Sequence, residues 1–130
     1  MNPKPDEIKE WLLIAEDDLT SAQILLNHEP PGLRATCFLC QQAVEKMLKA
    51  FLVWKSESFE KTHDISHLLD LCEIHGLEIT FLRDKAEILT SYAVEIRYPG
   101  DDIKVTREET EDALSITKDV WRLINSLICI

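Results

Sequence analysis

The sequence predicts an all-α protein, an antiparallel up-and-down four-helix bundle with a short accessory helix. Apolar residues recur at spacings of three and four through several long segments, as one face of a helix requires. The chain has only three glycines, and its five prolines lie near the expected segment ends. No run alternates apolar and polar residues with β-branched enrichment, as a half-buried strand would. Long helices with short connections pack as a bundle.

The segment 33–54, LRATCFLCQQAVEKMLKAFLVW, organises the predicted bundle. On a helix, its apolar residues cover roughly half of the cylinder, well beyond a narrow two-helix seam. That apolar side comprises Leu33, Cys37, Leu39, Cys40, Ala43, Val44, Met47, Leu48, Ala50, Phe51 and Trp54. A face of this width requires more than one neighbour, so we expect this helix at the centre.

The first helix is predicted over residues 5–27, because Pro5 followed by two acidic residues suits a helix start. Its core stripe is Ile8, Trp11, Leu12, Ala15, Leu19, Ala22 and Leu26. Asp18 lies near the edge of that stripe, where it could meet a cation on another helix. The segment 28–32, HEPPG, breaks the helix and turns the chain.

Two further helices are predicted between residues 64 and 99. Asp64 suits the cap of a short helix that stops at Gly76. Thr80 is the expected cap of a long fourth helix, which ends before Pro99. The core stripe of that long helix would be Leu82, Ala86, Leu89, Ala93 and Ile96.

The last helix is predicted to begin at Thr106, which forms a capping box with Glu109. Its expected core residues are Ala113, Ile116, Val120, Leu123, Ile124 and Leu127. A second apolar row on the same helix contains Leu114, Trp121 and Ile128, and the first helix adds Leu13 and Ile24 off its own stripe.

A row of this kind usually marks an interface, so we expect a homodimer. Trp121 and Leu114 are the candidates for its contact surface, although the dimer itself does not depend on this choice of face. Two other interpretations stay open. Scattered exposed apolar residues are normal on monomers, and the short third helix could cover Trp121 within one chain.

Length and composition limit the function classes. One domain over residues 1–130 is expected from the length. The net charge of −10 disfavours general binding to nucleic acid. No apolar run approaches the roughly 20 residues of a membrane span, and the N-terminal residues carry no signal-peptide core. We therefore expect a cytoplasmic protein with no membrane partner.

Cysteine and histidine spacings raise two possible metal or redox sites. Cys37 and Cys40 form a C-x-x-C pair, but they sit in the middle of an apolar helix face, which indicates core cysteines rather than a redox or zinc site. His63 and His67 are four residues apart and could be two ligands on one helical turn. Capping for His63 and a solvated position for His67 are the simpler interpretation, so we expect no metal.

Several short motifs, in chain order, resemble the HEPN family (higher eukaryotes and prokaryotes nucleotide-binding domain). They are Asp18-Leu19, the run 41–50 (QQAVEKMLKA), Thr62-His63-Asp64, and Tyr92 followed by the run 97–100 (RYPG). The resemblance spans nearly the whole chain. It implies a four-helix bundle with a short extra helix, usually a homodimer, often made beside a small nucleotidyltransferase as a two-component, toxin–antitoxin-like module.

Many proteins of this family are metal-independent ribonucleases, and their signature is an arginine followed four to six residues later by a histidine. Arg97 can hold the arginine position, at the edge of the fourth helix's apolar stripe. A guanidinium there could fork onto a carboxylate or phosphate, or instead satisfy helix-end carbonyls and pair with Asp101 or Asp18. No histidine follows Arg97 in the chain, so the expected acid or base is missing.

The resemblance therefore favours a non-catalytic component that binds a nucleotidyltransferase, a nucleotide or both, and needs no cofactor. The candidate nucleotide-binding residues are Lys46, Lys49, His63, Arg97, Tyr98 and Asp101. The lysines and Arg97 would meet phosphate, and Tyr98 would offer a stacking face. Two alternatives are a divergent ribonuclease that uses Arg97 and His63, and a purely structural helical dimer.

Overall fold

The computed structural model describes residues 4–93, 99 and 104–129, and this part of the chain is all-α, as predicted. Its helices are α1 (Pro5–Asn27), α2 (Leu33–Trp54), α3 (Ile65–Ile74), α4 (Thr80–Arg83), α5 (Ala86–Ser91) and α6 (Arg107–Leu127). Within these ranges there is no strand, and no helix has both the length and the apolar character needed to cross a bilayer.

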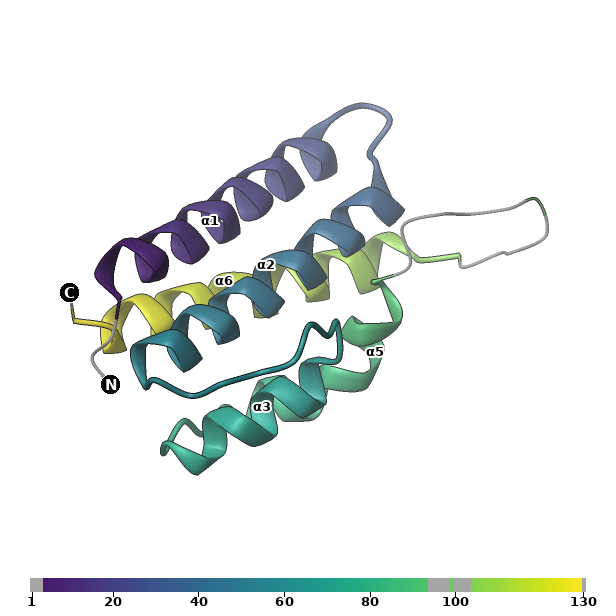
Figure 1. Ribbon diagram of the computed structural model, residues 1–130. Helices are drawn as coiled ribbons and strands as arrows, with labels where there is room; N and C mark the ends of the chain where they lie inside the picture. Colours follow the sequence, from purple (N-terminus) through teal and green to yellow (C-terminus); the bar gives the residue numbers. More distant parts are fainter. Residues whose placement is uncertain (1–3, 94–98, 100–103, 130) are drawn as a thin grey trace.

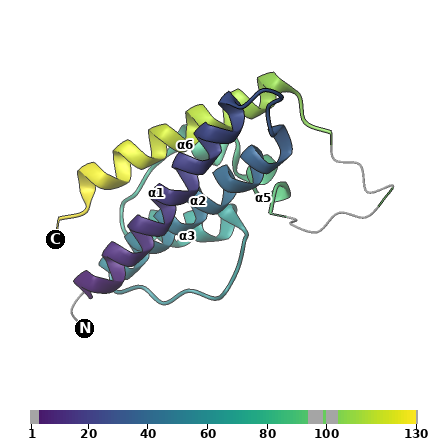
Figure 2. The ribbon, with the colours of Figure 1, turned by 90° about the horizontal axis from the view of Figure 1, so that it is seen from above.

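Helix α2 is central, as its wide apolar face predicted. It contacts α1, α3, α5 and α6, and α1 also contacts α6. Helix α1 runs opposite to both α2 and α6, while α3 and α5 lie on the other side of α2 from α1 (Figures 1 and 2). The start of α1 and the end of α6 lie at the same end of the molecule.

The long fourth helix expected from Thr80 is instead two short helices, α4 and α5, so the described chain has three long helices rather than four. The helical ladder is interrupted where the amide of Lys85 donates to the carbonyl of Leu82, three residues back rather than four. Thr80 lies inside α4 and its side chain caps nothing, because Ile79 holds the N-cap position. The expected core residue Ile96 lies outside the described residues.

The predicted core stripes and caps are otherwise largely as expected. In α6, the capping box forms: the hydroxyl of Thr106 accepts from the amide of Glu109 at 3.0 Å, and the Glu109 carboxylate accepts from the amide of Thr106 at 3.2 Å. Leu127 is the exception, because it is exposed where α6 ends. The next residue, Ile128, is buried in its place.

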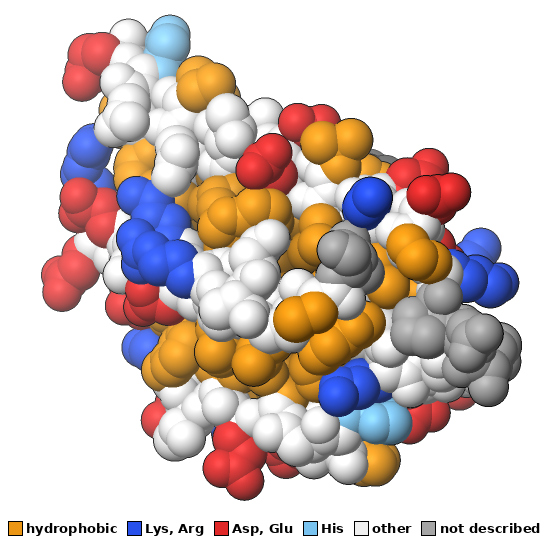
Figure 3. All heavy atoms as spheres, turned by 90° about the vertical axis from the view of Figure 1, so that its left-hand side faces the viewer, with side chains coloured by type: hydrophobic (Ala, Val, Ile, Leu, Met, Phe, Trp, Pro, Cys, Tyr) orange, Lys and Arg blue, Asp and Glu red, His pale blue; other side chains and the backbone are white. Residues whose placement is uncertain are grey.

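The second apolar row of α6 packs mostly inside the chain. Leu114 and Ile128 are buried, so they need no second molecule to cover them. Trp121 is half-buried and lines a hollow with Leu19 and Thr20 of α1, so α1 rather than the third helix lies beside it. Seen from the end where α1 begins, hydrophobic side chains form a broken band across the surface, with lysine and arginine side chains at several places around it (Figure 3).

Candidate functional site

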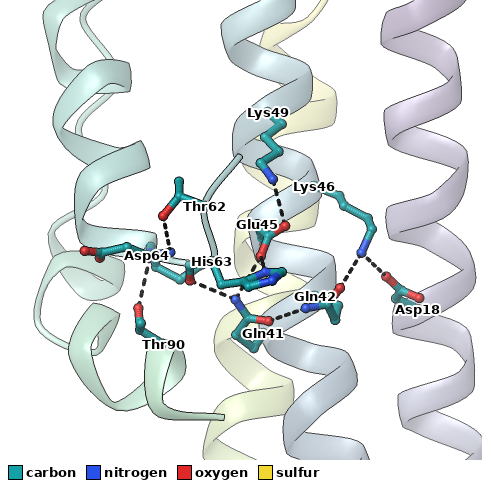
Figure 4. Close-up of polar contacts among 11 residues, drawn as sticks. Asp18, Gln41, Gln42, Glu45, Lys46, Lys49, Thr62, His63, Asp64 and Thr90 are labelled. Carbon is teal, nitrogen blue, oxygen red and sulfur yellow. Dashed lines mark hydrogen bonds and ion pairs between the residues drawn. The ribbon is translucent and has the colours of Figure 1, made fainter. Parts of the chain in front are cut away.

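A polar network lies on α2, between α1 and the loop that leads into α3 (Figure 4). Helical spacing of three and four places Gln41, Gln42, Glu45, Lys46 and Lys49 along one side of α2. Four of them, Gln42, Glu45, Lys46 and Lys49, lie on the side of the helix away from the apolar face that the sequence predicts. In the structure, however, Gln41, Glu45 and Lys49 are buried. The loop before α3 contributes Phe59 and His63, which contact this side of the helix.

Glu45 is the centre of the network. Its Oε1 accepts from Nε2 of Gln41 at 3.1 Å and lies 2.7 Å from Nδ1 of His63. Its Oε2 accepts from Nζ of Lys49 at 2.8 Å. Burial alone would raise the pKa of this carboxyl, but hydrogen bonds from Lys49, His63 and Gln41 outweigh it and lower the pKa. Glu45 is therefore a buried, ionised carboxylate.

Lys49 is held on two sides. Besides its ion pair with Glu45, its ammonium lies 5.6 Å from the ring centroid of Trp11 and 5.9 Å from that of Phe59. Those rings contact each other edge to face, at 6.3 Å between centroids. Such cation–π contacts strengthen when the cation is desolvated. Lys49 therefore joins α1, α2 and the loop, and a ligand from solvent cannot reach it without displacing them.

His63 is the exposed member of the network, with 65% of its side chain accessible. Because an ionised carboxylate only accepts, Nδ1 of His63 carries the proton in its contact with Glu45. The backbone of His63 is fixed as well, since its carbonyl accepts from Nε2 of Gln41 at 3.0 Å. Within the described ranges, Nε2 of His63 has no hydrogen-bond partner. The imidazole is thus oriented by Glu45 and presented to solvent.

The backbone around His63 is fixed by its neighbours in the Thr62-His63-Asp64 motif. The hydroxyl of Thr62 accepts from the amide of Asp64 at 3.0 Å. Asp64 caps α3 as predicted, accepting from the amide of His67 at 3.3 Å, so the capping role suggested for His63 belongs to Asp64. His67 is exposed, as expected of a solvated position.

Lys46 extends the network to α1. Its ammonium lies 3.2 Å from Oδ2 of Asp18, as the position of Asp18 at the edge of its stripe predicted. It also donates to Oε1 of Gln42 at 2.8 Å, and Gln42 in turn donates to Gln41 at 2.7 Å. The side chains of Lys46 and Asp18 keep 16% and 19% of their surface accessible. Unlike Lys49, Lys46 can therefore be reached from solvent.

The structure brings together three of the predicted site residues: Lys46, Lys49 and His63. The other three, Arg97, Tyr98 and Asp101, lie outside the described residues. Sequence reasoning missed Glu45 and Gln41, which connect the network. Their spacing along the run 41–50 indicates only that they lie on the same side of a helix. Nothing in the sequence shows that a loop covers them.

Cys37 and Cys40 are core residues, as predicted, and Cys72 is buried as well. Cys37, Cys40 and Cys72 are free and buried, whereas Cys129 is free and exposed. Burial raises the pKa of the Cys40 and Cys72 thiols to about 12, and also raises that of Cys37. No group of three potential metal ligands occurs in the part of the chain that the structure describes.

By its fold and site, the protein is an all-helical domain. Its central helix, α2, and the loop that follows it share a buried polar network. The chain belongs to the HEPN domain family, whose model matches residues 8–127. It is similar to TT1696 from Thermus thermophilus, at 25% identity and a TM-score of 0.79, over 93% of this chain and 98% of that one.

The fold is also similar to that of ST0689, an archaeal HEPN homologue. The identity is 22% and the TM-score 0.71, over 92% of this chain and 95% of that one. A comparison with curated proteins finds no match.

Proposed function

We propose that this HEPN protein is a non-catalytic, cytoplasmic binding component of a two-component, toxin–antitoxin-like module, which binds a small nucleotidyltransferase, a nucleotide or both. The observation that carries the proposal is the exposed imidazole of His63, which Glu45 orients at 2.7 Å. A rigid hydrogen-bonding group on a fixed backbone suits recognition, because little conformational entropy is lost when it binds.

The charges of the network divide the candidate residues by role. Asp18 and Glu45 balance Lys46 and Lys49, and the Glu45–Lys49 pair is almost fully buried. Lys49 therefore acts as a structural cation. Lys46 is accessible and could exchange Asp18 for a phosphate, which leaves Lys46 and His63 as the contact residues for a ligand. Arg97 and Tyr98 would complete the site from outside the described residues.

Thermal melts test the nucleotide part of the proposal. A nucleotide that binds only the folded state stabilises it by about 2.7 kcal/mol at a hundredfold excess over its Kd. We expect ATP or GTP to raise the Tm of the wild type, and Lys46→Ala to reduce that shift. Lys85→Ala is the control, because Lys85 pairs with Asp112 at the exposed surface and not with a residue of the network on α2. No Tm shift at millimolar nucleotide would contradict nucleotide binding.

Co-expression tests the protein-partner part. We expect a small nucleotidyltransferase encoded beside this gene to co-purify with the wild-type chain. His63→Asp should weaken the complex, because it places a second carboxylate beside Glu45 and removes the imidazole. Exposed His28 lies in the turn after α1, so His28→Asp should leave the complex intact. Failure of the two wild-type proteins to co-purify would contradict this part.

One observation favours the alternative of a divergent ribonuclease. A carboxylate that orients an imidazole is an arrangement used for general acid–base catalysis. In that case His63 would move the proton and Arg97 would stabilise the cleaved phosphate. Incubation with total RNA in EDTA separates the two functions. The binding proposal expects intact RNA, whereas cleavage that disappears in both His63→Ala and Arg97→Ala would support the ribonuclease.

A further inference from the structure

We infer that the group which a ligand presents to His63 is a neutral hydrogen-bond donor, an N–H or O–H, rather than a phosphate or a carboxylate. This inference rests on the proposed function, because it concerns the same site and a nucleotide bound there. It divides that nucleotide between the two contact residues. The phosphates meet Lys46, and an amino group of the base or a hydroxyl of the ribose meets Nε2 of His63.

The tautomer of His63 is set from inside the protein. Nδ1 lies 2.7 Å from Oε1 of Glu45, and an ionised carboxylate can only accept, so Nδ1 carries the proton. In the neutral ring the other nitrogen, Nε2, then has a lone pair and no proton. The ring is accessible, since 65% of the side chain is exposed. The edge that faces away from Glu45 is therefore an acceptor, which requires a donor opposite it.

The charge of Glu45 is balanced by a different residue. Oε2 of Glu45 lies 2.8 Å from the ammonium of Lys49, and both side chains are almost fully buried. The carboxylate therefore takes a hydrogen bond from His63 but needs no second positive charge. An anion placed at Nε2 would meet a lone pair, so it could bind only after the ring had taken up a proton. A neutral donor needs no such proton.

A chain of hydrogen bonds connects His63 to Lys46 and fixes its own direction (Figure 4). The ammonium of Lys46 donates to Oε1 of Gln42 at 2.8 Å, and Nε2 of Gln42 donates to Oε1 of Gln41 at 2.7 Å. Nε2 of Gln41 then donates to Glu45 and to the carbonyl of His63. Reversal of either amide would oppose two acceptors or two donors, so neither glutamine can turn over. The two contact residues are thus held at fixed positions relative to each other.

Lys46 is the end of this chain that suits an anion. Its ammonium donates to Gln42 and lies 3.2 Å from Oδ2 of Asp18, so at least one of its three N–H groups remains for a phosphate. Lys46 cannot accept a hydrogen bond, and Nε2 of neutral His63 cannot donate one. A nucleotide fits both ends, because its phosphate oxygens accept, whereas its ribose hydroxyls and the amino groups of its base donate.

The protonation of His63 in the complex tests the inference directly. Nitrogen-15 NMR of the imidazole at about pH 7.5 distinguishes the two neutral tautomers and the imidazolium. We expect the wild type to carry its proton on Nδ1, and saturation with ATP or GTP to leave that form unchanged. Glu45→Gln should lose the preference for one tautomer, because an amide can donate or accept. The exposed ring of His67 is the internal reference. An imidazolium, or a proton on Nε2, at His63 in the complex would overturn the inference.

Analogues of ATP identify the group that donates. Purine riboside 5′-triphosphate lacks the 6-amino group, and 2′,3′-dideoxy-ATP lacks both ribose hydroxyls. By calorimetry, we expect one of the two to bind the wild type about three- to tenfold more weakly than ATP, the effect of one lost hydrogen bond. His63→Ala should bind all three equally, because the acceptor is gone. Lys46→Ala is the matched variant, which should weaken all three by the same factor and keep the preference for ATP.

The outcomes separate this inference from the proposed function. If ATP and both analogues bind the wild type equally, the inference is wrong although nucleotide binding stands. A preference for ATP that persists in His63→Ala also contradicts it, because the donor then meets another residue. If GTP binds and ATP does not, the NMR measurement on the GTP complex decides. If neither nucleotide binds, the proposed nucleotide function fails, and this inference fails with it.

Discussion

Glu45 and His63 lie 18 residues apart in the chain, and Oε1 of the buried carboxylate is 2.7 Å from Nδ1 of the exposed imidazole. This contact ties the loop before α3 to the middle of α2. The same carboxylate neutralises Lys49, so one side chain both stabilises the interior and orients the surface residue proposed to meet a ligand. A substitution of Glu45 should therefore change both the stability of the fold and the binding of a ligand.

Replacing Glu45 by alanine should destabilise the fold strongly, because it leaves the ammonium of Lys49 buried without its counter-ion. Removal of one partner of a buried ion pair lowers the free energy of unfolding by about 3–5 kcal/mol. Urea unfolding at neutral pH measures the loss. The matched control is Asp119→Ala, which breaks the exposed pair with Arg122 and should cost about 0–1 kcal/mol. Equal effects of the two substitutions would contradict the central role of Glu45.

The contribution of Glu45 should also depend on pH. Its pKa in the folded state is lowered from 4.5, so the unfolded chain binds the proton more readily than the folded one. The stabilisation is therefore fully present above about pH 4.5 and is lost as the pH falls through the lower folded pKa. We expect the difference in unfolding free energy between wild type and Glu45→Gln to shrink below pH 4.5. A difference that stays constant down to strongly acidic pH would argue against this explanation.

Two lysines on α2, Lys46 and Lys49, show how much of the site the sequence could predict. The apolar stripes predicted α1, α2 and α6, because burial of the apolar face of each segment stabilises it as a helix. Lys46 and Lys49 have the same chemistry and lie three residues apart, yet only Lys49 is enclosed by Trp11 and Phe59. That difference arises from a loop of polar composition that folds back over the helix, and loop paths have no periodic signal.

The divided fourth helix has a similar cause. Its residues Leu82, Ala86 and Leu89 are all buried, as the stripe predicted. The spacing of apolar residues is the same whether or not the backbone ladder is continuous, so it cannot reveal the three-residue hydrogen bond at Lys85. Periodicity predicts which side of a segment is buried better than it predicts where a helix ends.

Thiol reactivity should separate the cysteines by burial. Cys37, Cys40 and Cys72 are buried, and their raised pKa values keep them protonated at neutral pH. A thiol reagent should therefore label the native protein only at Cys129, and label all four cysteines in urea. Mass spectrometry counts the labels. Rapid labelling of Cys37 or Cys40 in the native state would reopen the redox interpretation of the C-x-x-C pair.

The most direct test of the proposed binding role is an NMR titration that follows the imidazole resonances of the four histidines. Nucleotide or the purified nucleotidyltransferase is added to the wild-type chain. We predict that the ring signals of His63 shift and saturate, while those of exposed His28 and His67 stay in place. Glu45→Gln should weaken the response, because the imidazole loses its charged acceptor. Unchanged His63 signals under conditions where either ligand binds would contradict the assignment of this site.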